Sequence, residues 1–211
     1  MRRTSCLFLI VLLFSLQYSM AQKNISKWSV VPRIGINSSN VSNKTSSLHV
    51  EYPTPHNIYG PTVRKVGLTA GVDVDYRYLQ RLSTSVGMFY SDEGYKQSVV
   101  WTDAMSMKYL SLGLHENFYP VDWLALKAGL QAAYMLDFGY DDYIGRKPDK
   151  WNLSLPVGLS LEYWNIVVDF RYNIGLVDIG GGKFDDGKKC LTNTLWLTIG
   201  YRINLQKNKW K

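Results

Sequence analysis

Hydrophobic and polar residues alternate with a period of two along most of this chain, the pattern of β-strands with one apolar face. No helical periodicity of any length follows Gln22. In the last such stretch every second residue is apolar: Leu195, Leu197, Ile199, Tyr201, Ile203 and Leu205. The pattern predicts eight strands, at about 28–37, 66–76, 82–90, 110–118, 124–136, 151–163, 166–176 and 194–205.

The connections between these segments alternate between short and long. Short turns are expected near 77–81, 120–122 and 164–165, and long loops at about 38–64, 92–107, 137–150 and 178–190. Up-and-down barrels of outer membranes have short periplasmic turns and long outer loops. The sequence therefore predicts an all-β fold, an eight-stranded antiparallel up-and-down transmembrane β-barrel, with both chain ends on the periplasmic side.

Glycines indicate which face of the sheet lines the lumen. Each predicted strand has one glycine on its polar parity: Gly35, Gly71, Gly87, Gly113, Gly129, Gly158, Gly175 and Gly200. The interior of an eight-stranded barrel is just wide enough to be filled by side chains, so small residues belong there. The polar face is therefore expected to point inward.

That orientation places four basic and four acidic residues in the lumen: Arg33, Lys127, Arg171, Arg202, Asp73, Asp75, Glu162 and Asp169. An isolated buried ion costs several kcal/mol, so charges in a narrow lumen must pair. The balance of signs favours a structural charge network over an ion path or a catalytic cluster. An open diffusion channel is disfavoured because eight strands and a charged lumen leave no room for one.

Aromatic residues near the predicted strand ends resemble the two girdles of a membrane barrel. The members are Trp28, Tyr76, Tyr90, Tyr109, Phe118, Tyr119, Trp123, Tyr134, Trp151, Tyr163, Trp164 and Tyr172. The alternative is a soluble lipocalin-like barrel with its apolar face around a ligand. Lysine, glutamate and threonine would then dominate the polar face, whereas it is mainly glycine, serine, alanine and asparagine with balanced charges.

Residues 1–21 have the features of a secretory signal peptide. Arg2 and Arg3 precede an apolar run at 6–16 that is too short to span a bilayer, and Ser19-Met20-Ala21 suits cleavage before Gln22. The remaining 22–211 is expected to form one domain, in which Cys190 is the only cysteine. A mean hydropathy of -0.15 with 14% aromatic residues is ordinary for such a barrel.

The net charge of +7 becomes +5 without Arg2 and Arg3. The basic residues of the chain form no helix face, so we expect no nucleic-acid partner. Their expected role is contact with lipid head groups or plain solubility.

With the strands placed, the mature chain resembles the PorT-like outer-membrane β-barrel family of the Bacteroidetes. The stretches that carry the resemblance are 31–37 (VPRIGIN), 88–95 (MFYSDEGY), 109–112 (YLSL), 170–179 (FRYNIGLVDI) and 199–203 (IGYRI). Gly113 stands in place of the family's proline, and Pro156 interrupts another strand, where a bulge is expected. The resemblance implies an outer-membrane barrel associated with protein secretion by the type IX route, and it carries over no functional residue.

Chemistry beyond this is sparse. The alternative function is a lipid-modifying enzyme that uses lumen-facing His115; the other histidines are His49 and His56. Ser111 and Asn117 lie on its face, but even residues two apart on a strand face are about 7 Å apart, too far for a direct hydrogen bond.

Acidic pairs at 141–142 and 185–186 lack the spacing of a calcium loop. We therefore expect no catalytic, cofactor or metal site in a monomeric barrel whose partners are outer-membrane lipid and envelope or secretion proteins.

Overall fold

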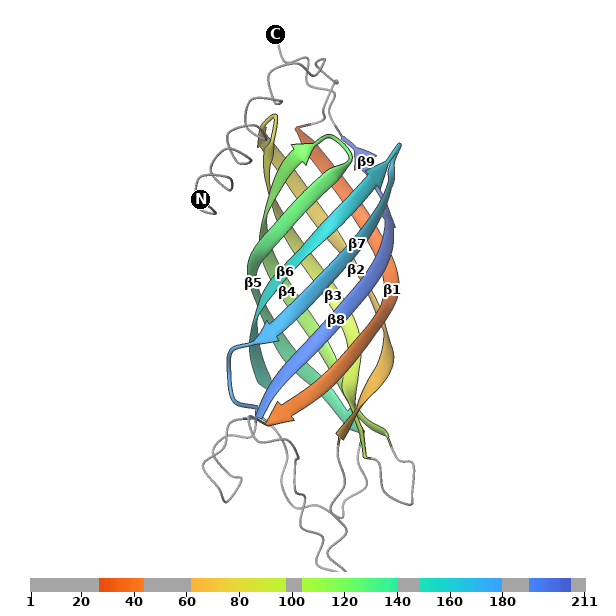
Figure 1. Cartoon of the computed structure of the whole chain (residues 1–211), viewed down its shortest axis with the longest axis vertical. Helices are drawn as coiled ribbons and strands as arrows, with labels where there is room; N and C mark the ends of the chain where they lie inside the picture. Colours follow the sequence, from red (N-terminus) through yellow and green to blue (C-terminus); the bar gives the residue numbers. More distant parts are fainter. Residues whose placement is uncertain (1–26, 44–61, 98–103, 140–148, 180–189, 206–211) are drawn as a thin grey trace, which may run out of the picture.

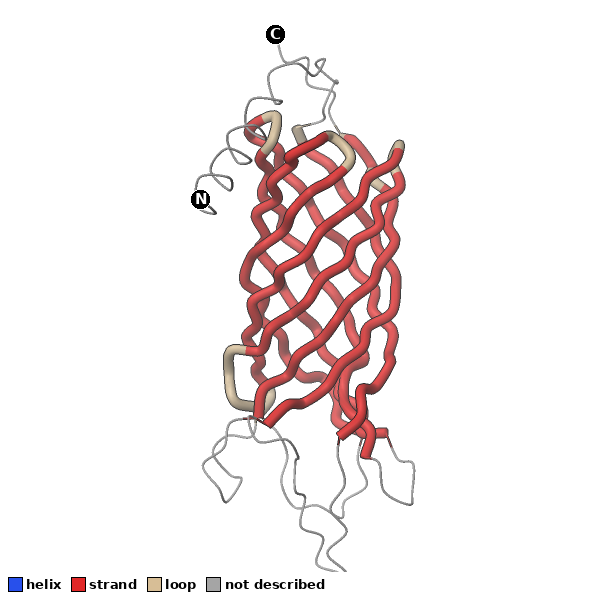
Figure 2. The backbone as a smooth tube through the Cα atoms, in the orientation of Figure 1, coloured by secondary structure: helices blue, strands red, loops and turns tan. Residues whose placement is uncertain are grey.

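The computed structural model describes residues 27–43, 62–97, 104–139, 149–179 and 190–205, and the protein is a tall barrel of tilted strands (Figures 1 and 2). The strands are β1 (Trp28–Asn43), β2 (Thr62–Leu79), β3 (Leu82–Gln97), β4 (Ala104–Val121), β5 (Leu124–Gly139), β6 (Trp151–Tyr163), β7 (Ile166–Gly175), β8 (Cys190–Tyr201) and β9 (Ile203–Asn204). In the described part of the chain no helix is long and apolar enough to cross a membrane.

The sheet closes on itself. Every strand from β1 to β7 pairs antiparallel with the next one, and β8 closes the barrel by pairing with β1. The short β9 continues β8 beyond Arg202 and pairs with β1 at Ser29 and Val30. The expected closed, up-and-down barrel of eight strands is thus confirmed, and closure leaves no sheet edge with unpaired backbone groups.

Most strands extend further toward the long connections than the apolar alternation indicates. The first strand was expected to end at Asn37, but β1 runs on to Asn43, opposite Cys190 of β8. Residues of this extension are mostly serine and asparagine. Backbone pairing needs no apolar side chain, so a ladder can continue beyond the apolar band that alternation detects.

The short turns lie at one end of the barrel, the turn end, and the long connections leave from the opposite loop end (Figure 1). Turns fall at 80–81, 122–123 and 164–165, as expected within two residues. The expectation of a bulge at Pro156 is wrong. Pairing with β5 lapses at this proline while the register is the same on both sides, and pairing with β7 is continuous. Proline lacks a donor, and here the barrel loses ladder bonds without an extra residue.

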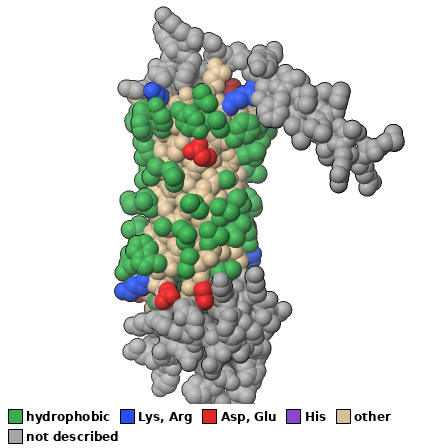
Figure 3. Space-filling view, turned by 90° about the vertical axis from the view of Figure 1, so that its left-hand side faces the viewer, with side chains coloured by type: hydrophobic (Ala, Val, Ile, Leu, Met, Phe, Trp, Pro, Cys, Tyr) green, Lys and Arg blue, Asp and Glu red, His purple; other side chains and the backbone are tan. Residues whose placement is uncertain are grey.

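The two faces of the wall differ sharply. On the outside, leucine, isoleucine and valine cover the middle of the barrel (Figure 3), including Leu197 at 45% and Ile199 at 53% exposure. The inward face carries the buried polar and charged residues. The predicted inward orientation of the polar parity is confirmed, but Tyr109 and Tyr119 are not in a girdle. They have inward parity and are buried in the lumen, at 1% and 4% exposure.

Candidate functional site

Five of the eight predicted lumen charges meet in one cluster at mid-height, the central cluster: Arg33, Lys127, Arg171, Asp73 and Asp169. Arg33 Nε lies 2.7 Å from Asp73 Oδ2. Asp169 Oδ2 lies 2.8 Å from Lys127 Nζ and 3.5 Å from Arg33 Nη1, and its Oδ1 lies 3.3 Å from Arg171 Nε. Ser160 Oγ donates a further bond to Asp169 at 2.5 Å. Three cations therefore share two buried carboxylates that strands β2 and β7 provide.

The other three charges form a second cluster nearer the turn end. Arg202 Nη1 lies 2.6 Å from Asp75 Oδ2, and its Nε lies 2.6 Å from Glu162 Oε1. The guanidinium also donates to Ser29 Oγ at 2.6 Å and to the Tyr119 hydroxyl at 3.4 Å. This turn-end cluster connects β2 and β6 through Arg202, which lies between β8 and β9. Its two carboxylates and one cation offset the single positive excess of the central cluster.

Two glycines make room for the central side chains. A Cβ on Gly87 would lie 2.1 Å from Asp73 Oδ1, and a Cβ on Gly113 would lie 2.5 Å from Cε1 of His115. Both glycines are on the inner face of neighbouring strands β3 and β4. Their missing side chains leave the space that the aspartate and the imidazole occupy.

His115, the only histidine among the described residues and the base of the alternative enzymatic function, is buried beside the central cluster. Its Nε2 lies 3.3 Å from Arg171 Nη1. Since a guanidinium can only donate hydrogen bonds, Nε2 must accept, and its lone pair is engaged. The ring is 1% exposed. The arrangement uses His115 as a hydrogen-bond partner of a buried arginine.

An aromatic layer lies on the loop side of the central cluster. Phe89 and Trp196 are both 1% exposed, with ring centroids 5.4 Å apart. The Arg171 guanidinium carbon lies 5.1 Å from the Phe89 centroid and 5.6 Å from that of Trp196. Such cation–π contacts suit a desolvated arginine, so this layer both packs the lumen and stabilises the charge below it.

A polar group that the sequence did not single out lies above this layer. Glu93 accepts bonds from Ser91 Oγ at 2.9 Å and Thr194 Oγ1 at 2.8 Å, and it is 5% exposed. Lys65 pairs with Asp92 and donates to Ser106 Oγ at 2.9 Å. Apart from Thr194 of β8, these residues lie beyond the alternating segments, in the extended parts of β2, β3 and β4. Only the strand register brings them together.

Apolar side chains fill the lumen at the loop end. The cluster consists of Val41, Met107, Tyr109, Ala133, Met135 and Ile179, with Tyr95 and Phe138 packed against it. Ile179 comes from the segment after β7, and its carbonyl accepts a bond from Asp149 N at 2.8 Å. Charge pairs, aromatic rings and this apolar cluster thus occupy successive levels of the described lumen.

No group of three or more histidine, cysteine or acidic residues able to hold a metal ion occurs among the described residues. His49, His56 and the acidic pairs at 141–142 and 185–186 lie outside them, as does the expected signal peptide at 1–21. The chemistry of the described lumen is that of paired charges and hydrogen bonds.

A closed eight-stranded wall, an apolar outer face and a polar, filled lumen define a small transmembrane β-barrel, the fold of small outer-membrane barrels. No family model and no curated protein matches the sequence.

Several solved structures similar to this chain are outer-membrane proteins. Ail, the attachment invasion locus protein of Yersinia pestis, is 20% identical, with 85% of this chain and 100% of that chain covered and a TM-score of 0.46. OprG from Pseudomonas aeruginosa is 12% identical, with 85% and 97% covered and a TM-score of 0.49. Neisserial surface protein A is 15% identical, with 85% and 98% covered and a TM-score of 0.45. The barrel class rests on the strand pairing and the two faces of the wall.

Proposed function

We propose that this chain is a non-enzymatic barrel of the bacterial outer membrane that acts through its ends, as a scaffold or binding partner for envelope proteins. The observation that carries the proposal is the filled lumen. A wall whose interior is occupied by the central cluster, the turn-end cluster and the aromatic layer has no described route for a solute. Partners are then left with the loop end, the turn end and the lipid-facing wall.

A narrower role, association with protein secretion by the type IX route, is supported by the resemblance to the PorT-like family. The motifs that carry this resemblance lie in β1, β3, β4, β7 and β8. A secretion-associated barrel needs stable anchorage in the membrane and surfaces at both ends. The paired lumen suits the first requirement, because interlocked charges on five strands, together with Arg202 between β8 and β9, hold the wall in one arrangement. The long connections at the loop end suit the second.

The first test is a deletion strain complemented with the wild type or with His115→Gln. We expect loss of the gene to reduce the amount of secreted proteins in the medium, and both versions to restore it. A neutral amide can still accept a bond from Arg171. Lipid A and phospholipid mass spectra are expected to be the same in all strains.

The outcome that contradicts the proposal is a lipid change that the wild type reverses and His115→Gln does not. A general base usually contributes a factor of about 10²–10⁴ in rate, so its loss would be plain in the spectra. That result would support a lipid-modifying enzyme. Unchanged secretion in the deletion strain would remove the secretion role and leave a scaffold or binding barrel.

Orientation gives a second prediction. A broad-specificity protease added to intact cells is expected to cut only in the connections 44–61, 98–103, 140–148 and 180–189, because loop ends of outer-membrane barrels face outward. Mass spectrometry of the fragments locates the cuts, and permeabilised cells are the control. Cleavage at the 122–123 turn in intact cells would show the opposite orientation.

A further inference from the structure

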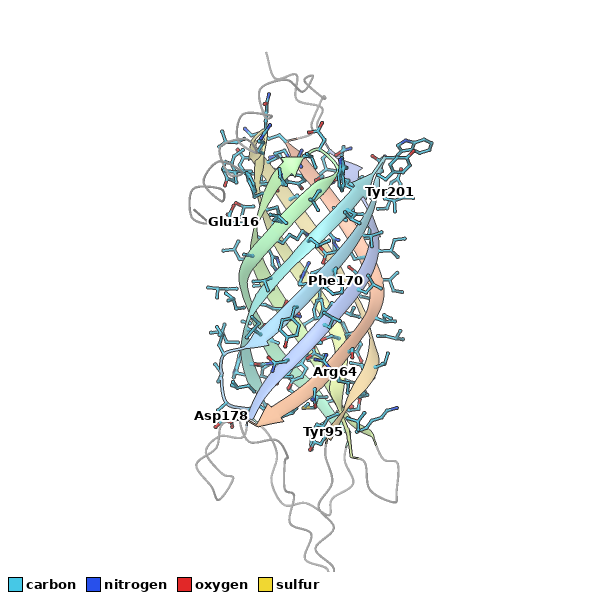
Figure 4. All side chains as sticks on the ribbon, in the orientation of Figure 1. Arg64, Tyr95, Glu116, Phe170, Asp178 and Tyr201 are labelled. Atoms are coloured by element: carbon cyan, nitrogen blue, oxygen red, sulfur yellow. The ribbon has the colours of Figure 1, made fainter. Side chains whose placement is uncertain are left out.

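One carboxylate lies on the lipid-facing wall instead of in the lumen. Glu116 is exposed on the outer face of β4, on the opposite parity from the buried His115 and Asn117. It points away from the barrel in the part nearer the turn end (Figure 4). Its neighbours two residues away on the same face are Leu114, which is 54% exposed, and Phe118. Glu116 thus interrupts an apolar surface.

Two hydroxyl groups from neighbouring strands hold this carboxylate. The Tyr78 hydroxyl of β2 donates to Oε2 at 3.0 Å, and Thr84 Oγ1 of β3 donates to Oε1 at 2.5 Å. Thr84 is directly opposite Glu116 in the register. An ionised carboxylate has about four acceptor positions, so these two bonds leave about half of them open.

Glu116 differs from the acidic residues of the two lumen clusters, which all pair with arginine or lysine. Among the described residues no lysine or arginine forms an ion pair with it. Ionisable residues on a membrane-facing surface are costly, and their presence indicates a function. The two hydroxyl donors orient the carboxylate without neutralising it, so a cation from outside the chain is the complementary partner.

The level of the site in the wall indicates the kind of cation. Tyr78 is the penultimate residue of β2, next to the turn, and its ring extends to Glu116 from there. Tyrosine rings at such positions lie at the level of lipid head groups. Apolar Val86, which is 47% exposed, and Leu114 continue the surface from the site toward the middle of the barrel, where acyl chains pack.

We propose that Glu116, Tyr78 and Thr84 form a lipid-binding site for the primary ammonium of a phospholipid head group in the leaflet at the turn end. The ammonium brings three N–H donors to the open acceptor positions of the carboxylate. The acyl chains of the same phospholipid lie along Val86 and Leu114. This inference rests on the barrel spanning a bilayer and not on a role in secretion.

The test uses the purified barrel in nanodiscs of phosphatidylcholine with a minor fraction of phosphatidylethanolamine. Native mass spectrometry counts the lipids that remain bound after release from the disc. We expect the wild type to retain phosphatidylethanolamine preferentially, and the preference to fall stepwise as the amine is methylated. Glu116→Gln is expected to reduce the preference about tenfold, as suits the loss of one charged hydrogen bond.

Leu130→Gln is the matched control, because Leu130 is 53% exposed on the same outer face and lies on the neighbouring strand β5. It is expected to leave the preference unchanged. A heat-dependent shift in gel mobility shows that each variant is folded and inserted. Should Glu116→Gln fail this check, the methylation series on the wild type decides the matter by itself.

Three results would overturn the proposal. The first is a wild type that retains all methylation states equally. The second is equal preference in the wild type and Glu116→Gln. The third is a cross-link from the Glu116 position to another protein, lost in Glu116→Gln while lipid retention is unchanged, which would identify a protein interface instead.

Discussion

Asp169→Asn is expected to lower the free energy of unfolding of the barrel by about 3–5 kcal/mol, the range for removal of one partner from a buried ion pair. Asp169 is 1% exposed and lies within ion-pair distance of Arg33, Lys127 and Arg171. The amide that replaces it carries no charge, so three buried cations are left to share Asp73. Reversible denaturant unfolding in lipid vesicles, followed by tryptophan fluorescence, measures the change.

Asp137→Asn is the matched control for this prediction. Asp137 pairs with Lys108 at 2.7 Å, but the two side chains are 56% and 42% exposed. Exposed pairs contribute about 0–1 kcal/mol, so the control is expected to stay within that range. The double change Asp169→Asn with Lys127→Met removes one surplus cation and is expected to recover part of the loss. Equal effects of Asp169→Asn and Asp137→Asn would show that the central cluster does not stabilise the barrel.

Leu197→Arg is expected to cost about 2–4 kcal/mol, the range for a basic residue at the bilayer midplane on the lipid face of a barrel. Leu197 lies in β8, opposite Ile36 of β1 and Phe170 of β7. A guanidinium there meets acyl chains with no carboxylate in the register. The same unfolding measurement applies.

Two variants separate charge from other effects at this position. Leu197→Ala removes volume alone and is expected to cost less than Leu197→Arg. Thr198→Ser changes the neighbouring inward residue, which is 3% exposed and opposite Asp169, and keeps its hydroxyl. It is expected to be the mildest of the three. If Leu197→Arg were no worse than Thr198→Ser, the apolar face would not be in contact with lipid.

The central cluster shows how far residue parity carries and where it stops. Alternation in β1, β2, β5 and β7 is enough to place Arg33, Asp73, Lys127 and Asp169 on one face of the wall. Parity says nothing of height, because it does not specify the stagger between strands. Arg33, Lys127 and Arg171 pair with Asp169 and not with Asp75. This choice depends on the register of every intervening strand.

Tyr109 and Glu93 show a different limit. Both lie where strands extend beyond the alternating segments. Tyr109 was expected in a girdle from its aromatic type and its position near a strand end. Lumen-facing residues can share both properties, so they do not distinguish the two faces. Glu93 lies beside Gly94, whose φ of 142° belongs to an irregular end of β3. Its bond to Ser91 lies within β3, but its bond to Thr194 joins β3 to β8, which are not neighbours in the sheet.

The number of barrel strands, their antiparallel order, the end from which the long connections leave and the face that meets the lumen can all be read along the chain, since each follows from local alternation and turn spacing. Which charges pair, how far the strands extend, that Pro156 makes no bulge, and that Glu116 meets Tyr78 and Thr84 on the outer wall became known from the folded barrel alone. Closing the barrel sets a stagger between neighbouring strands. Contacts between side chains from different strands depend on that stagger, and no single segment of the chain contains it.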